Sequence, residues 1–458
     1  MNREDIRLFE EFVQKKMAET NIPGMSVAVV EDGEITYSRG FGFRDVEAGL
    51  PATSRSLYGI GSVTKSFTAL AIMQLVEKGL LSLDDPVEKY VPLDLKVMGE
   101  PVRVIHLLTH SLGIPALGYA EAFIRGSLQL DTEWIPLASY DDIFTFMKGS
   151  TEWAEAKPGE KFFYLNEGYV LLGYIIEKVS GIKYEEYVYK NILGPIGMKR
   201  TFFEKELVEK DPDKATAYII TREGKRVRSW FPYGITADGG LISNVLDMAR
   251  YLTMYMNRGE INGKRILSAK SIEEMEKPRI KTPFETLGGE SYGLGWIITP
   301  NLYGYKLVGH SGSVLVYTAY AGYVPEKKIG VVLLANASGY PLSLIGLFLL
   351  SILLGKNPYD LEPLLFDKIL DELRGRYETF KGSMRAIVSR HGDMLSLEMR
   401  DKLTETIVPL IPVEKLDPER PRFFTLSRGR RVEAEFYKKD GNWYLIYERY
   451  KFKKIGAQ

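Results

Sequence analysis

The chain has 458 residues, more than one hydrophobic core usually fills, so we expect at least two domains. Its 60 basic side chains balance 60 acidic ones, and this zero net charge argues against nucleic acid as a partner, because phosphate binding requires a positive excess. The sequence contains no cysteine, which excludes thiol catalysis, disulfides and cysteine-based metal sites.

The N-terminal segment 1–20 is charged and amphipathic and lacks the apolar run of a signal peptide. The most apolar stretch, 342–354, is interrupted by serines and is short for a bilayer, so we interpret it as a buried or oligomer-contacting helix. We therefore expect a soluble, cytoplasmic protein with no membrane partner. Many Lys, Arg and Glu residues without cysteine are typical of a thermophile.

Apolar residues recur at helical spacing in segment 3–20, which predicts an amphipathic helix. Segment 25–37 predicts a β-hairpin, because a β-rich run leads into an Asp-Gly turn and a second extended run. Further helices are predicted at 64–79 and 168–179, each followed or ended by a glycine.

Strand patterns return after residue 292, at 306–308, 314–323 and 329–335. Strands near both ends of this region, with helices between them, indicate one sheet that both ends of a domain build together. We expect the helices to pack against that sheet.

Segment 351–374 contains two prolines and is interpreted as a linker between a first domain, 1–350, and a second domain, 375–458. The second domain consists of short alternating segments separated by turns, such as those at 391–393 and 439–441. This spacing predicts a small antiparallel barrel or sandwich.

Ser62 and Lys65 lie one helical turn apart and so share a helix face. Acyl transfer by serine requires a group that takes the hydroxyl proton, and a lysine in a dry site can be neutral enough to do so. The same spacing recurs at Ser180 and Lys183, where Gly181 at a helix end would break the geometry. Context favours Ser62, because the N–H groups of the helix that follows it suit an oxyanion.

Tyr164 and Asn166 form the second motif, just after a turn and ahead of an apolar helix. A tyrosine beside a lysine can act as general base for the nucleophile and as general acid for the leaving group. The asparagine amide can orient the lysine or hold a substrate carbonyl. The same spacing at 189–191 and 255–257 lies in amphipathic helical stretches and is interpreted as packing.

The third motif lies at a strand of the second β region and contains His310, Ser311, Gly312 and Ser313. Glycine at this place permits close approach of a ligand to the backbone. The N–H of Ser313 is a candidate second oxyanion donor, beside that of the nucleophile.

The remaining histidines carry weaker signals. His106 and His110 are four residues apart, but Leu107 stands where a zinc-hydrolase helix has its glutamate, so we interpret both as structural. His391 lies in a predicted turn. We expect no metal and no organic cofactor.

These motifs, together with the phrases at 22–30, 60–69, 107–115 and 158–166, resemble the serine β-lactamase and penicillin-binding family, specifically its CubicO-type peptidase and esterase branch. The resemblance implies an α+β domain with an antiparallel sheet, helices on both faces and a helical subdomain. The segment that opens at Gly375 resembles the lipocalin-like barrel attached to some archaeal CubicO-type serine proteases.

The resemblance implies roles for the motif residues. Ser62 would be the nucleophile, Lys65 the adjacent base and Tyr164 a second base, with the division of work between the two bases open. Asn166 would be a positioning residue, and the 310–313 motif would line the pocket. Many β-lactamases have lysine where this chain has His310, and a largely neutral histidine anchors a substrate carboxylate less firmly, which argues against antibiotic hydrolysis as the main role.

We therefore expect a serine peptidase that forms an acyl-enzyme on short peptides, a range that the resemblance extends to peptides containing D-amino acids. An esterase or β-lactamase-type hydrolase on the same site is the first alternative, and a non-catalytic penicillin-recognising or ligand-binding receptor is the second. The joint presence of serine, lysine and tyrosine speaks against the receptor. The expected partners are a small peptide substrate and further copies of the chain. The resemblance of the barrel implies that it restricts access to the active sites or helps to build a closed homo-oligomer around them; the alternative is a barrel that only stabilises the fold.

Overall fold

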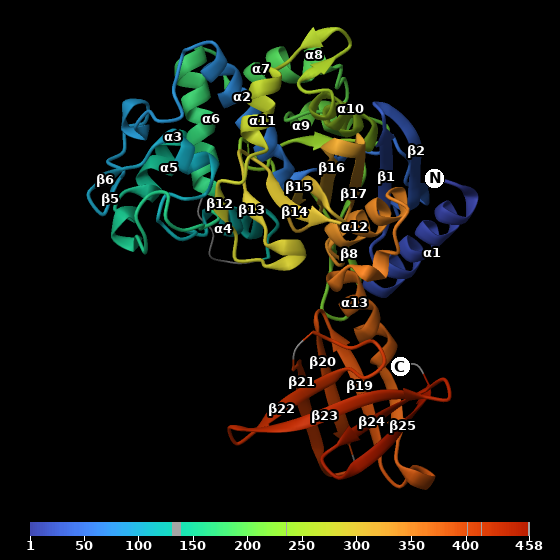
Figure 1. Ribbon diagram of the computed structural model, residues 1–458. Helices are drawn as coiled ribbons and strands as arrows, with labels where there is room; N and C mark the ends of the chain where they lie inside the picture. The colour runs from blue at the N-terminus through green and yellow to red at the C-terminus, as the bar shows by residue number, and fades with distance from the viewer. Residues whose placement is uncertain (131–138, 235, 401, 414, 457–458) are drawn as a thin grey trace. The chain divides into compact units, whose positions relative to one another are not determined.

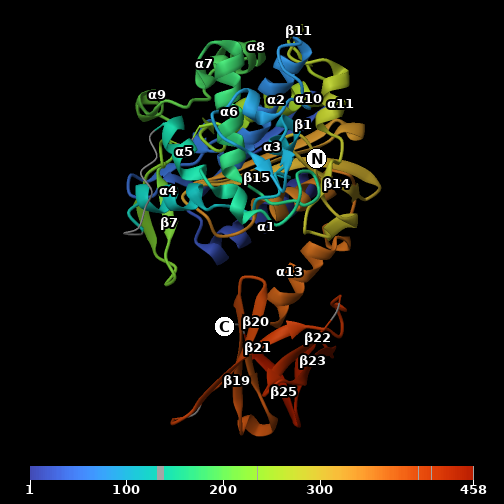
Figure 2. The ribbon, with the colours of Figure 1, turned by 90° about the vertical axis from the view of Figure 1, so that its left-hand side faces the viewer.

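The computed structural model describes residues 1–130, 139–234, 236–400, 402–413 and 415–456. They fall into two units, 1–355 and 356–458 (Figures 1 and 2).

A nine-stranded antiparallel sheet organises the first unit, in the order β12-β13-β14-β15-β16-β17-β1-β2-β3. Its strands are β1 (Gly24–Glu31), β2 (Glu34–Asp45), β3 (Leu50–Pro51), β12 (Ile280–Lys281), β13 (Ser291–Tyr292), β14 (Ile297–Leu302), β15 (Tyr305–Ser313), β16 (Thr318–Val324) and β17 (Ile329–Ala335). The centre of the sheet joins the two ends of the unit, because β1 pairs with β17, with Met25 opposite Ala335. The predicted sheet built from both ends is confirmed.

Helices cover both faces of this sheet, as β17 shows. Helix α10 (Val245–Met256) lies against Gly330, and α12 (Leu342–Leu353) lies against Leu333. The two residues are three apart in an alternating strand, so they point to opposite faces. All of β17 is therefore buried. Helix α1 (Arg3–Thr20) stacks on α12 through the rings of Phe12 and Phe348.

A helical region occupies the middle of the first unit and lies to the left of the sheet in Figure 1, opposite α1. Its central helices are α2 (Thr64–Glu77), buried from residue 64 to residue 75, and α6 (Asn166–Ser180), which packs against it. The other helices of the unit are α3 (Val104–Leu108), α4 (Tyr119–Ser127), α5 (Tyr140–Met147), α7 (Tyr184–Val188), α8 (Gly194–Ile196), α9 (Lys205–Lys210) and α11 (Ala269–Met275). Short strand pairs complete it: β4 (Tyr58–Gly59) with β9 (Ile242–Ser243), β5 (Lys96–Val97) with β6 (Glu100–Pro101), β7 (Ala217–Ile220) with β8 (Arg226–Ser229), and β10 (Glu260–Ile261) with β11 (Lys264–Arg265).

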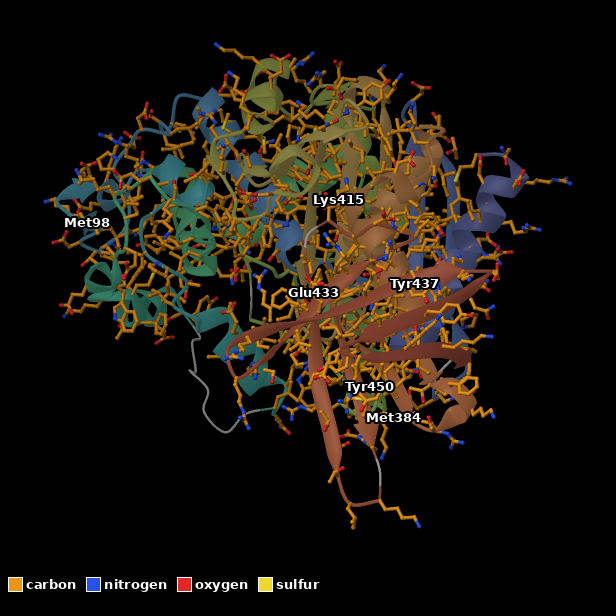
Figure 3. The ribbon with its side chains drawn as sticks, turned by 60° about the horizontal axis from the view of Figure 1, so that its bottom comes forward. Met98, Met384, Lys415, Glu433, Tyr437 and Tyr450 are labelled. Carbon is orange, nitrogen blue, oxygen red and sulfur yellow. The ribbon has the colours of Figure 1, made fainter. Side chains whose placement is uncertain are left out.

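The second unit is a closed antiparallel barrel. Its strands, in barrel order, are β18 (Gly375–Glu378), β19 (Arg385–His391), β20 (Met394–Arg400), β21 (Glu405–Pro412), β22 (Arg422–Ser427), β23 (Arg430–Lys439), β24 (Asn442–Tyr447) and β25 (Tyr450–Gly456). Along β23, Ala434 and Phe436 are buried in the barrel core, while Glu433 and Tyr437 lie on the other face (Figure 3). The predicted α+β fold, a β-lactamase-like domain followed by a small all-β barrel, is confirmed.

Two segments differ from the sequence prediction. The predicted linker 351–374 contains the end of α12 and a full helix, α13 (Glu362–Leu373). Apolar side chains of α13, among them Leu370 and Leu373, belong to the barrel core, and this burial stabilises a helix that the two prolines obscured. The predicted strand 314–323 starts later, at residue 318, because residues 314–317 form a turn with Leu315 in the left-handed region.

The most apolar helix, α12, is buried between the sheet and α1, in agreement with its interpretation as a buried helix. Within the described residues, helices long and apolar enough to cross a membrane are absent.

Candidate active site

Ser62 lies at the head of α2, in a 3₁₀ turn, Gly61–Val63, that leads directly into the helix. Gly61 has a φ of 50°, and a Cβ added to it would lie 2.7 Å from the backbone nitrogen of Ser313. The turn therefore requires glycine both for its conformation and for the close approach of β15. Ser62 stays partly exposed beside the unpaired N–H groups that open a helix.

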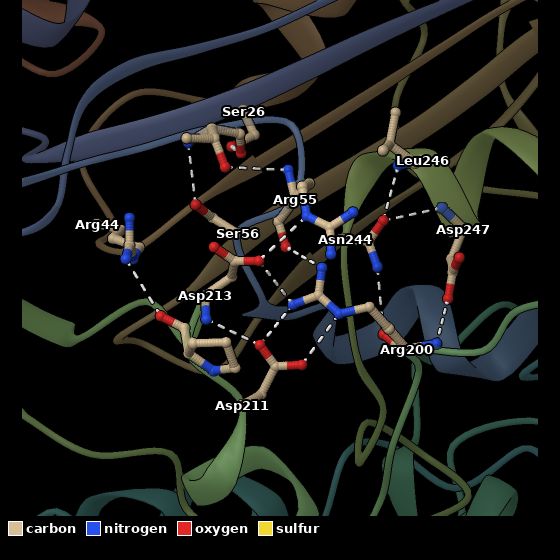
Figure 4. Close-up of polar contacts among 12 residues, drawn as sticks. Ser26, Arg44, Arg55, Ser56, Arg200, Asp211, Asp213, Asn244, Leu246 and Asp247 are labelled. Carbon is tan, nitrogen blue, oxygen red and sulfur yellow. Dashed lines mark hydrogen bonds and ion pairs between the residues drawn. The ribbon is translucent and has the colours of Figure 1, made fainter.

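An ion-pair cluster fixes the chain segment just before this turn (Figure 4). Arg200 donates two hydrogen bonds to the carboxylate of Asp211 and one to the backbone carbonyl of Arg55. Arg55 in turn pairs with Asp213, with Nε 3.3 Å from Oδ2. Because bidentate guanidinium–carboxylate pairs have a defined geometry, the cluster holds this segment in one position.

The Lys65 amine is fully buried and has three partners. Its Nζ lies 3.1 Å from Ser62 Oγ, 2.7 Å from Asn166 Oδ1 and 2.6 Å from the backbone oxygen of Asp238. These partners come from the 3₁₀ turn, from the first residue of α6 and from the loop before β9. They satisfy all the positions that a lysine nitrogen offers.

Tyr164 lies two residues before the start of α6 and over the lysine, with Lys65 Nζ 5.0 Å from the centre of its ring. Its hydroxyl is buried and has no hydrogen-bond partner among the described residues. Because a buried hydroxyl without a partner is costly, this one is available to a ligand or to the serine hydroxyl.

The ring of His110 packs against the ring of Tyr164. Its Nδ1 accepts a hydrogen bond from the N–H of Leu165 at 3.1 Å, and its ring lies 4.1 Å from that of Tyr164. Burial lowers the pKa of His110 well below its usual value, so the ring is neutral. His110, interpreted from the sequence as structural, thus packs beside Tyr164 in the candidate site.

His310 lies on β15 and is also neutral. Its Nδ1 donates to the backbone oxygen of Ser311 at 2.6 Å, so its Nε2 accepts from the hydroxyl of Tyr292 at 2.9 Å. Burial lowers its pKa to about 4. The side chain therefore brings no positive charge into the site at neutral pH.

The end of β15 lies directly against the nucleophile turn. A Cβ added to Gly312 would lie 2.0 Å from the backbone oxygen of Ile60 and 3.0 Å from the nitrogen of Ser62. Glycine here therefore allows the two backbones to touch. As a result, the backbone of Ser313 lies beside that of Ser62, where two N–H groups can face one oxyanion.

A single pocket of about 640 Å³ contains every predicted site residue except the buried Lys65. The predicted residues that line it are Ser62, Tyr164, Asn166, His310, Ser311, Gly312 and Ser313. Its wall also includes Asp238 and Glu121, which the sequence analysis did not single out. The pocket size suits a short peptide or a small acyl compound.

Two buried carboxyl groups lie close to this pocket. Asp238 is 2% exposed, and its Oδ1 has no partner among the described residues. Burial raises its pKa, and the Lys65 charge offsets part of that rise. Glu167, in the first turn of α6, is 1% exposed, and burial raises its pKa to about 7. Its Oε1 accepts the N–H of Tyr119 at 3.2 Å.

The rival motif copies lie elsewhere. Lys183 pairs with Glu177 at 3.4 Å on the surface, outside the set of residues that line the pocket. His106 caps the start of α3, where its Nδ1 accepts the N–H of Arg103. His391 belongs to the barrel, where it bonds Ser396. Among the described residues, no group of three or more His, Asp or Glu side chains could hold a metal ion.

Sequence reasoning missed Asp238, Tyr292 and the position of His110. Asp238 stands in a Gly-rich loop ahead of a buried strand, and this loop is the one signal that could have been followed. Tyr292 and His110 come close to the other site residues only in the folded chain, because their neighbours in the sequence are ordinary helix and strand residues.

Comparisons with known proteins match both units of the chain. The model of the β-lactamase family matches residues 9–346, and that of the Pab87 octamerisation domain matches residues 358–453. The chain is 53% identical to the octameric penicillin-binding protein homologue from Pyrococcus abyssi; the two structures align with a TM-score of 0.93 over 98% of this chain and 100% of that chain.

Two curated relatives are more distant. Penicillin-binding protein 4* of Bacillus subtilis is 25% identical over 447 residues, 92% of each chain. Protein flp of Staphylococcus aureus is 26% identical over 332 residues, 71% of this chain, and the chain spans 62% of the length of Protein flp.

We predict that Gly61→Ala disrupts the site more than Gly263→Ala does. Both glycines have positive φ, so both variants carry a backbone cost of about 1–2 kcal/mol. Gly263 has open space around it, whereas the new Cβ at Gly61 meets the backbone of Ser313. Denaturant unfolding and the rate of reaction with a fluorophosphonate probe measure the two effects. Equal losses in the two variants would contradict the close approach of β15.

We also predict that Glu167 makes folding stability depend on pH. Its pKa is about 7 in the folded protein, against 4.5 ordinarily, so the folded state binds a proton that the unfolded chain releases. Stability should therefore fall as pH rises through this interval. Glu167→Gln cannot ionise, so its free energy of unfolding relative to the wild type should rise by up to about 3 kcal/mol between pH 5 and pH 8.

Urea unfolding at both pH values measures this difference. Glu152→Gln, at an exposed position outside the pocket, is the matched control and should show no such change. If the stability curves of Glu167→Gln and the wild type stay parallel, Glu167 is not a buried titrating group.

Proposed function

This chain belongs to the β-lactamase family, and we propose that it is a serine peptidase in which Ser62 attacks the acyl carbon of a short peptide. The observation that carries the proposal is the 3.1 Å contact between the buried Lys65 Nζ and Ser62 Oγ. Peptides containing D-amino acids are part of the proposed range, on the family resemblance. No cofactor takes part in the proposed reaction.

The proposed reaction begins when the proton of Ser62 moves to a base as Oγ bonds to the carbonyl carbon. A neutral Lys65 amine has two protons, one each for Asn166 Oδ1 and the backbone oxygen of Asp238. Its lone pair then faces the serine hydroxyl, which is the arrangement of a general base. Tyr164 can instead take the proton as a phenolate beside a charged lysine, so both assignments stand.

The tetrahedral intermediate would place its oxyanion between the backbone N–H groups of Ser62 and Ser313. Its collapse expels the leaving amine, which takes a proton from the same base, and leaves an acyl group on Ser62. Water, deprotonated by that base, then releases the acid product and restores the serine. The free hydroxyl of Tyr164 supports its part in proton transfer to the leaving group.

An esterase or β-lactamase-type hydrolase is the first alternative, because the same acyl chemistry serves esters and lactams. The neutral His310 weakens the β-lactam version, since it offers no charge to a substrate carboxylate. The second alternative, a non-catalytic receptor, is weakened by the intact hydrogen bonds around Lys65.

We also propose that the chain forms a closed homo-oligomer through its barrel. The match to the Pab87 octamerisation domain and the octameric assembly of the Pyrococcus abyssi homologue support this proposal. In such an assembly the active sites face an enclosed space that admits short peptides. A cytoplasmic, thermophilic setting belongs to the same proposal.

We predict that a fluorophosphonate probe forms an adduct on Ser62 and that Ser62→Ala takes no label. Lys65→Met should lower the labelling rate about 100-fold or more, because it removes the base or its electrostatic support. Ser180→Ala and Lys183→Met are matched controls in the second copy of the motif and should label at the wild-type rate. Peptide mass mapping locates the adduct. A folded protein that takes no label, even without its barrel, would favour the receptor.

We predict that a chain ending at residue 355 forms smaller assemblies and cleaves longer peptides than the full chain does. The truncation removes the whole second unit and leaves the pocket residues in place. Light scattering gives the assembly mass, and cleavage of a peptide length series gives the substrate range. If neither changes, the barrel has no role in assembly or access.

A further inference from the structure

Among the described residues that line the pocket, Asp238 is the buried acidic side chain that the proposed chemistry leaves unused. Its loop is held firmly by α2: Thr68 Oγ1 donates to the backbone oxygen of Ala237 at 2.6 Å, and Thr64 Oγ1 accepts the N–H of Leu241 at 3.2 Å. The loop therefore presents the Asp238 side chain at a fixed place in the wall of the pocket that contains Ser62.

One oxygen of this carboxyl group is left without a partner. Oδ1 of Asp238 is buried and receives no hydrogen bond from any described residue. Lys65 is the nearest positive charge, but its three hydrogen bonds go to Ser62, Asn166 and the backbone oxygen of Asp238, not to the carboxylate. A buried carboxylate oxygen in this condition is costly, and a donor supplied by a ligand would remove the cost.

The surroundings of Asp238 are negative. Glu121, in the first turn of α4, lines the same pocket and is exposed at its rim. Glu167 is buried nearby: burial raises its pKa, and the charges of Glu121 and Asp238 add to this rise. Arg125 also lines the pocket but is exposed, and it forms no ion pair within the described part of the chain. His310 is neutral.

We propose that Asp238, with Glu121 at the rim, binds a primary ammonium group of the acyl donor. The inference rests on the proposed function, since it names the substrate class of the same site. An ammonium group donates each of its N–H bonds separately, so one free carboxylate oxygen is enough to bind it. A guanidinium group binds a carboxylate through two parallel hydrogen bonds, which require two free oxygens. The described residues offer no set of ligands for a metal ion. The ammonium group belongs either to the free amino end of the substrate or to a lysine-like side chain.

Two pairs of p-nitrophenyl esters test the proposal and distinguish these sources. Glycyl and propionyl esters differ only in the group on the α-carbon, which is ammonium in one and methyl in the other. The 6-aminohexanoyl and heptanoyl esters differ in the same way at the end of the acyl chain that lies farthest from the carbonyl. None of the four is chiral, so the unknown stereochemical preference does not matter. The ratio of kcat/KM within each pair, corrected for spontaneous hydrolysis, measures the preference for ammonium.

The wild type should prefer the ammonium ester in at least one pair, by about tenfold or more, as a charge-assisted hydrogen bond provides. A preference in the glycyl pair identifies the amino end, and one in the aminohexanoyl pair identifies a side chain. Asp238→Asn should lower that ratio about tenfold, and Glu121→Gln, at the exposed rim, should lower it less. Glu186→Gln, an exposed change on α7 outside the pocket, should leave the ratio unchanged.

A second measurement does not depend on any variant folding. Butylammonium should inhibit hydrolysis of the propionyl ester by the wild type at lower concentrations than 1-butanol does. Equal ratios in both ester pairs, or a ratio that survives in folded Asp238→Asn, would overturn the ammonium site while leaving the serine hydrolase intact. If Ser62→Ala hydrolyses all four esters as fast as the wild type does, the proposed function and the inference both fall.

Discussion

The arrangement of the site depends on one buried amine. Lys65 has no exposure to solvent, so its nitrogen requires protein partners, and it finds them on three separate elements. Ser62, Asn166 and the backbone of Asp238 are each fixed by that requirement. A shift of α6, or of the loop before β9, would cost the amine one of its three partners. The lysine therefore holds these elements together at the pocket.

The charges around the pocket follow from the same burial. His310 and His110 are neutral because desolvation disfavours their charged forms, and each has only backbone or tyrosine partners for its bonded nitrogens. Burial also disfavours the ionised forms of the Asp238 and Glu167 carboxyl groups, and it therefore raises the pKa of both. Away from the lysine, the acidic residues in the wall of the pocket are the buried Asp238 and the exposed Glu121.

The sequence predicts well what short spacing determines. Ser62 and Lys65 meet because one helical turn separates them, and the barrel strands follow from alternation between turns. Contacts across the fold are a different matter: Tyr292 reaches His310 only through sheet geometry, and Asp238 reaches Lys65 through a loop with no regular pattern. The sequence does not predict helix α13, because prolines at 358 and 363 suggest a linker. The apolar face of the helix is buried only through its packing in the barrel core.

The pairing of β1 with β17 has a consequence for synthesis of the protein. Residue 25 lies opposite residue 335, so the central sheet cannot close until the strand at 329–335 has been made. The nucleophile turn likewise waits for the end of β15 to arrive beside it. Such distant pairings form slowly, and a chain still being translated carries Ser62 before the backbone of Ser313 lies beside it. The pocket around Ser62 therefore takes shape only after most of the first unit has been synthesised.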